Sequence, residues 1–207
     1  HIEMSKFIQQ SAATYVDDYE YGAAGINDSL IYVAGSFSGA FVTTDGTSIS
    51  GGGFVTVLDT SGNVVYSSVL EETPDLVRVG KNGNLYLTGT TGDDLLPTTN
   101  GSVIHPDEDD SFLAMYSLAT ILSNAPGPDY FTYLGTVDAY MYDMEIEDGN
   151  VYIMMEADEA GNFVTNGSSY QGGGYDAYFM KIDSSSMAAQ TLLPSHPSNF
   201  ASYFGGP

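Results

Sequence analysis

Four consecutive acidic residues form the densest group of candidate metal ligands in the sequence: Asp107, Glu108, Asp109 and Asp110. Carboxylate oxygens in a loop suit Ca²⁺. We therefore expect Asp107, Asp109 and Asp110 as the metal ligands and Ca²⁺ as the candidate cofactor. The run lacks the ligand spacing of an EF-hand loop, and a solvated acidic loop without metal is the alternative that the same residues allow.

The histidines and the other carboxylates give no catalytic motif. His105 and His196 each precede a proline, and neither has a nucleophile motif beside it. A Ser-His-Asp triad is assembled in space rather than along the chain, and a pair of carboxylates can hydrolyse a glycosidic bond, so both chemistries stay open. Among 27 acidic residues, however, some pair always looks suggestive. We expect no catalytic residues and favour a chain that is not an enzyme.

The chain is strongly acidic, with a net charge of −23 from 27 carboxylates and only four cationic side chains. Such a charge repels a phosphate backbone, which excludes nucleic acid as a partner. No run of about 18 apolar residues is present that would insert into a membrane. The absence of cysteine excludes disulfides and thiolate metal sites. Abundant Ser, Thr, Gly, Asn and Tyr with little lysine is typical of exported proteins, so we expect a secreted or cell-surface location.

The elements that must position any site are short strands in an internal repeat. Three alternating apolar stretches follow turns rich in Asn, Asp and Gly, which predicts strands after tight hairpin turns. These stretches are residues 30–35, 85–89 and 151–155. Each is followed by a turn with Thr and Asn or Asp, at residues 43–47, 98–102 and 164–168. The recurrence of strand and turn in register predicts three copies of one unit.

Each copy contains enough strands for one small sheet. Two further apolar strands follow each turn, at residues 54–59 and 66–70, 112–117 and 130–135, and 178–183 and 200–206. Another strand precedes each opening turn, near residues 19–26, 75–80 and 140–147. The long connections 118–129 and 184–199 are expected to be loops. Four antiparallel strands per copy are what a β-propeller blade requires.

We therefore predict an all-β fold, a β-propeller-type repeat of four-stranded antiparallel blades with about three blades in this chain. The predicted divisions are an N-terminal segment with a stray strand at residues 1–18, then blades at 19–74, 75–139 and 140–207. Single-chain propellers carry about four to eight blades. Three would form a partial propeller or one completed by oligomerisation, with self-association through blade edges.

Four segments match the strand motifs of a known repeat: residues 83–91, 96–99, 130–135 and 174–181. In these motifs the sequence resembles the SBBP family of bacterial β-propeller repeats, over about residues 11–206. The resemblance implies a β-propeller, and stacking of blades face to face would cover the two faces of each sheet. Two places depart from it: Met154 and Met155 replace a Thr-Gly pair, and Glu71 and Glu72 replace a Gly-Gly pair.

The tyrosines recur at fixed repeat positions. Tyr32, Tyr86 and Tyr152 share one position, and Tyr133 and Tyr203 share another. Such recurrence favours packing in the core, although exposed aromatic rings also stack on sugars. The tyrosines are therefore interpreted as structural.

These observations favour a non-enzymatic, exported or cell-surface β-propeller module for ligand binding, adhesion or assembly of a surface structure. A carbohydrate or a cell-surface protein is the candidate ligand. One alternative is a structural subunit of an extracellular filament. The other is part of a secreted glycoside hydrolase or lyase.

Overall fold

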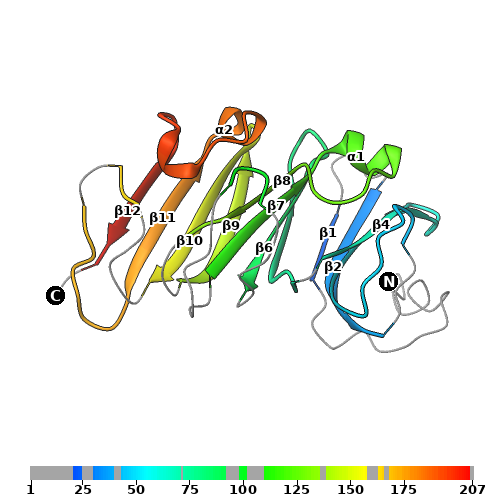
Figure 1. Ribbon diagram of the computed structural model, residues 1–207, viewed down its shortest axis with the longest axis horizontal. Coiled ribbons are helices and arrows are strands. Elements are labelled where there is room, and N and C mark those ends of the chain that lie inside the picture. Colours follow the sequence, from blue (N-terminus) through cyan, green and yellow to red (C-terminus); the bar gives the residue numbers. More distant parts are fainter. Residues whose placement is uncertain are drawn as a thin grey trace.

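The computed structural model describes residues 21–24, 30–39, 43–70, 72–91, 98–101, 110–135, 139–157, 163–165 and 168–205. In this part of the chain the fold is all-β, as expected, and the strands form three antiparallel sheets of four strands each. The stray strand expected within residues 1–18 lies outside the described residues. Figure 1 shows the three sheets following one another along the long axis in chain order.

The strands of each sheet are hydrogen-bonded in the order in which they occur along the chain. The first sheet contains β1 (Tyr21–Ala24), β2 (Leu30–Ser38), β3 (Gly51–Asp59) and β4 (Val64–Leu70). The second contains β5 (Leu76–Val79), β6 (Leu85–Thr91), β7 (Asp110–Tyr116) and β8 (Tyr130–Tyr133). The third contains β9 (Ala139–Glu147), β10 (Asn150–Ala157), β11 (Asp176–Ile182) and β12 (Phe200–Phe204).

The hairpins that open the second and third sheets turn at the residues expected from the sequence. Asp148 and Gly149 between β9 and β10 both have positive φ, at 52° and 79°. Two positive values in succession are typical of a type I′ turn, whose twist matches that of the paired strands. Between β5 and β6, Gly83 has a φ of 82°.

A threonine in each repeated turn fixes the fourth strand of its sheet. Thr44 Oγ1 accepts the backbone N–H of Ser67 at 2.7 Å. Thr99 Oγ1 accepts that of Phe131 at 3.0 Å, and Thr165 Oγ1 that of Ala201 at 3.0 Å. In each case the backbone N–H of the threonine also donates to the carbonyl of the same strand residue. The turn therefore continues the hydrogen bonding beyond the sheet edge, in the same way three times.

The long connections between third and fourth strands contain short helices rather than loops alone. Helix α1 (Leu118–Ser123) begins after Ser117, whose side chain accepts the backbone N–H of Thr120. Helix α2 (Ser184–Ala188) begins after Asp183, whose side chain accepts that of Ser185, and the 3₁₀ turn η3 (Leu193–Ser195) follows. The expectation of plain loops was wrong here because both positions carry good N-cap residues. Both helices lie along the same side of the stack in Figure 1.

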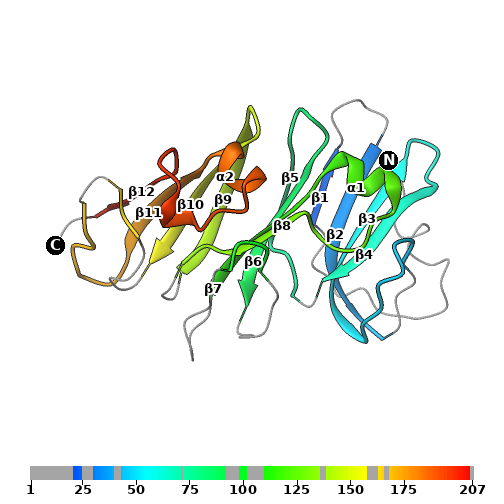
Figure 2. The ribbon, with the colours of Figure 1, turned by 45° about the horizontal axis from the view of Figure 1, so that its top comes forward.

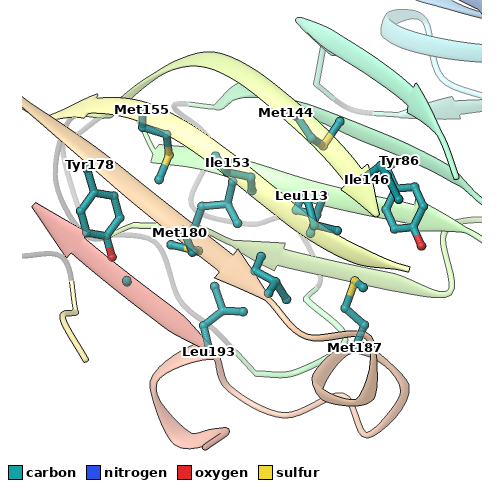
Figure 3. Packing of buried hydrophobic residues seen from close by; sticks show 14 of the residues in the cluster. Tyr86, Leu113, Met144, Ile146, Ile153, Met155, Tyr178, Met180, Met187 and Leu193 are labelled. Atoms are coloured by element: carbon teal, nitrogen blue, oxygen red, sulfur yellow. The ribbon is translucent and has the colours of Figure 1, made fainter. Parts of the chain in front are cut away.

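The sheets stack through large apolar faces. We call the face of each sheet that carries Tyr32, Tyr86 or Tyr152 its leading face, and the opposite face its trailing face. One core cluster joins the leading face of the first sheet, with Tyr32 and Val55, to the trailing face of the second, with Leu87 and Phe112. A second cluster joins the leading face of the second sheet to the trailing face of the third. Figure 3 shows Tyr86 and Leu113 of the second sheet beside Ile146 and Ile153 of the third sheet in this second cluster.

Strand register shows that these faces are equivalent from sheet to sheet. Tyr32 lies opposite Val57, Tyr86 opposite Met115, and Tyr152 opposite Lys181 on the neighbouring strand. Each of those partners in turn lies opposite an aromatic residue of the fourth strand, which is Tyr66, Tyr130 or Phe200. The three sheets thus present the same positions to the same side. Figure 2 shows the order of the sheets from a second direction.

Candidate functional site

The leading face of the third sheet is apolar and exposed, although its equivalents in the first two sheets are buried. Tyr32 and Tyr86 are each 1% exposed, whereas Tyr152 is half-buried. Met154 is 41% exposed at the position where Ala34 and Thr88 are buried. Phe204 is 55% exposed where Leu70 and Leu134 are buried. A face with the composition of an interface is therefore left in contact with solvent.

An aromatic row crosses this face from β10 to β12. The ring centroids of Tyr152 and Phe179 are 6.4 Å apart, and those of Phe179 and Phe200 are 6.1 Å apart. Both distances lie within the range of favourable ring contacts. The row joins three strands into one continuous apolar surface.

Lys181 is the one cationic residue within the strands of this face. Its Nζ lies 3.4 Å from Asp183 Oδ2, so the charge is directed toward the end of β11. The equivalent residues in the other sheets are the apolar Val57 and Met115. A lysine can place its methylene groups along apolar surface while its amine stays hydrated. Lys181 is thus compatible with an apolar contact across the face.

A surface cavity of about 380 Å³ lies at one end of β9, β10 and β11. Two carboxylate residues, Glu156 and Asp176, line it together with the exposed rings of Tyr142 and Tyr175. The hydroxyl of Tyr142 donates to Glu156, and this contact raises the pKa of Tyr142. The cavity therefore combines aromatic faces with acidic groups.

Asp176 is the most buried of these groups, at 2% exposure. Its Oδ2 accepts the backbone N–H of Gln171 at 2.5 Å. Its Oδ1 has no hydrogen-bond partner within the part of the chain that the structure describes. A Cβ placed on Gly205 would lie 1.7 Å from this oxygen, so the carboxylate needs a glycine beside it.

Two ion pairs join the second sheet to the first strand of the third sheet. Arg78 Nη2 lies 2.7 Å from Asp143 Oδ1, and Lys81 Nζ lies 2.7 Å from Glu147 Oε1. Both pairs are largely exposed and contribute little stability. Their arrangement shows, however, how charge is matched across a sheet-to-sheet interface, with cations on β5 and its following turn and carboxylates on β9.

The predicted calcium ligands are only partly covered by the structure. Asp107 and Asp109 lie outside the described residues, and Asp110 is the first residue of β7, opposite Thr91. In the ranges that are described, no group of three or more His, Cys, Asp or Glu residues could hold a metal ion. The calcium site at Asp107, Asp109 and Asp110 stays a prediction.

His196 has a serine and an aspartate nearby, but in an order unlike that of a catalytic triad. Its Nε2 lies 3.4 Å from Ser185 Oγ, while that hydroxyl donates to Asp183 Oδ1. Its Nδ1 accepts the backbone N–H of Ser198 at 3.3 Å. In a triad the serine donates to the histidine, and the aspartate accepts from the other ring nitrogen. Here Asp183 caps α2 instead. His105 lies outside the described residues.

The structural interpretation of the tyrosines is confirmed at four positions and wrong at one. Tyr32, Tyr86, Tyr133 and Tyr203 are buried. Tyr152 is not, because no described element covers the leading face of the third sheet. Sequence reasoning assigned all three equivalent tyrosines the same environment and so missed the exposed face. The available signal was the change from Val57 and Met115 to Lys181, which indicates a position closer to solvent.

Comparison with known proteins adds no relative. No protein-family model matches the sequence, and no curated protein matches it either. Among the helices of the described part, none is long and apolar enough to cross a membrane.

Proposed function

We propose that the chain is a non-enzymatic, exported or cell-surface module of β-propeller type that serves in the assembly of a larger surface structure. The observation that supports this proposal is the exposed leading face of the third sheet. The same face is a packing surface in the first two sheets, so the chain carries one interface more than it satisfies by itself. The β-propeller type in this proposal is based on the resemblance of the sequence motifs to SBBP repeats.

The acidic charge of the chain supports an exported protein that binds another protein rather than nucleic acid. With a net charge of −23, the chain repels phosphate groups. Its four cations are few, and the three that lie in the described residues, Arg78, Lys81 and Lys181, all form ion pairs. A partner of neutral or basic surface is favoured by the remaining carboxylates.

A test of the surface assignment uses intact cells of the source with an antibody against the purified chain. Protease added outside the cells should remove the signal, while a cytoplasmic marker enzyme should survive. Full protection of the chain in unbroken cells would contradict an exported location.

One observation favours a glycoside hydrolase as the alternative. Glu156 and Asp176 line the same cavity, and two carboxylates are the minimum that this chemistry requires. We expect no turnover of aryl glycosides by the purified chain. Turnover that disappears in both Glu156→Gln and Asp176→Asn, with Glu145→Gln as a folded control, would overturn the non-enzymatic proposal.

A further inference from the structure

We infer that the leading face of β9–β12 binds a further four-stranded sheet of the same repeat, joined in series after the third sheet. This inference rests on the proposed modular function and names the partner of its exposed face. The kind of partner is inferred from the two interfaces inside the chain. In both, the leading face of one sheet packs against the trailing face of the next sheet.

The positions on the face are those that a following sheet covers. Phe179 lies opposite Met154, just as Leu113 lies opposite Thr88 and Val55 opposite Ala34. Leu113 and Val55 are both fully buried by the sheet that follows them. Phe179 is larger than either and is only half-buried. A trailing face with the apolar character of Leu87, Phe112 and Ala114 would bury it.

The charges specify the partner further. In the second sheet, Arg78 lies opposite Tyr86 and pairs with Asp143 on the first strand of the next sheet. In the third sheet, Glu145 occupies the position opposite Tyr152. The charge is reversed, so the first strand of the bound sheet should carry Lys or Arg where β9 carries Asp143.

The same charges argue against a second copy of this chain. Its first sheet begins with β1 (Tyr21–Ala24), whose sequence contains no cation. The trailing face of that first sheet is already buried at Val33, Phe54 and Val69. Two copies would also bring together net charges of −23 each. The favoured partner is therefore a different sheet of the repeat with a basic first strand.

The test extends the full chain after Gly205 with a second copy of residues 135–205 that carries Asp143→Arg. If the added sheet docks, the chain unfolds in one transition, with a Tm at least about 4 °C above that of the parent. Nitration of Tyr152 by tetranitromethane should also slow several-fold. A second extension appends residues 71–135 in place of 135–205. It keeps the test valid if the first added sheet does not fold.

A matched substitution shows whether this face is responsible. Phe179→Glu in the original third sheet should remove the gain in Tm and restore nitration of Tyr152. In the parent the same substitution should lower Tm by less than it does in the extended chain, because it removes only the ring contacts with Tyr152 and Phe200 there. If both extensions leave Tm and Tyr152 unchanged, the inference fails.

Sedimentation of the parent gives the competing outcome. A dimer that Phe179→Glu dissociates would mean that a second copy occupies the face, which would overturn the inference. Failure of the proposed function is distinguishable from failure here, since glycoside turnover or a cytoplasmic location would not alter the docking of the added sheet.

Discussion

At the level of single residues, the second sheet has a position where a backbone passes too close for a side chain. A Cβ on Gly89 would lie 2.5 Å from the carbonyl oxygen of Thr73 and 2.9 Å from the ring of Phe112. The equivalent residue of the third sheet is Met155, which is fully buried in the cluster between the second and third sheets. The departure of Met155 from the repeat motif is therefore a packing substitution.

Gly89→Ala should destabilise the chain by about 1–3 kcal/mol, because the new methyl group must displace a backbone carbonyl. Gly174→Ala is the matched control, since a Cβ there has no neighbour within 4 Å and its φ is not in the left-handed region. Urea unfolding of both variants measures the difference. Equal stability of the two would contradict the close approach of Thr73.

Thr99→Val removes the side-chain oxygen that accepts the N–H of Phe131 and donates to its carbonyl. Leaving that N–H without its partner should cost about 1–3 kcal/mol. Thr99→Ser keeps the oxygen and should recover most of this loss. A valine variant as stable as the serine variant in urea would show that the turn is not held in this way.

Burial raises the pKa of Tyr130 to about 12, and the pKa values of Tyr66, Tyr116 and Tyr178 are raised by the same cause. Burial favours the neutral forms of these tyrosines in the folded chain. The stability that this preference contributes is complete below the unfolded pKa of about 10 and is lost as pH rises toward 12. Between pH 9.5 and pH 11.5, the free energy of unfolding measured in urea should fall by about 2 kcal/mol less in Tyr130→Phe than in the parent. Parallel curves would contradict the assigned burial.

At the level of elements, the three sheets are alike in register but not in environment. Asn84 Oδ1 and Asn150 Oδ1 each accept the backbone N–H that begins a helix, at Leu118 and Ser184. Asp59 at the end of β3 instead accepts the N–H groups of Ser61 and Asn63 in a short turn. Ser117 and Asp183 occupy the repeat position of Asp59 and cap α1 and α2, so the length of the connection after this position decides whether a helix forms.

Tyr86→Ala and Tyr152→Ala compare one repeat position in two environments. Truncating the buried Tyr86 should cost about 3–5 kcal/mol. Truncating Tyr152, which no following sheet covers, should cost less than about 1 kcal/mol. Thermal unfolding monitored by circular dichroism distinguishes the two. Similar losses would mean that the leading face of the third sheet is covered in the isolated chain.

At the level of the whole molecule, the stack is stabilised by apolar faces while its charge opposes compaction. The exposed ion pairs of Arg78 and Lys81 contribute little, and 27 carboxylates face only four cations. Sodium chloride should therefore raise Tm by screening repulsion between the carboxylates. Choline chloride provides a control for a specific sodium effect. A fall in Tm with either salt would indicate that the ion pairs outweigh the repulsion.

Much of this architecture could be predicted from the sequence, because period-two alternation and Gly-containing turns depend only on local residues. The strands containing Tyr32, Tyr86 and Tyr152 were found in this way. The helices after Ser117 and Asp183 were missed, since the copies differ in length there and short helices have weak periodicity. The exposed face was missed for another reason: burial depends on whether a following sheet is present, which equivalent residues such as Tyr86 and Tyr152 do not reveal.

The most direct test of the central claim is the nitration of individual tyrosines in the parent chain, followed by mass spectrometry. The claim is that every sheet uses the same face to receive the next one. It predicts rapid modification of the exposed Tyr175, measurable modification of Tyr152, and protection of Tyr32 and Tyr86. If Tyr86 reacts as fast as Tyr152 in the folded chain, the sheets do not stack through these faces.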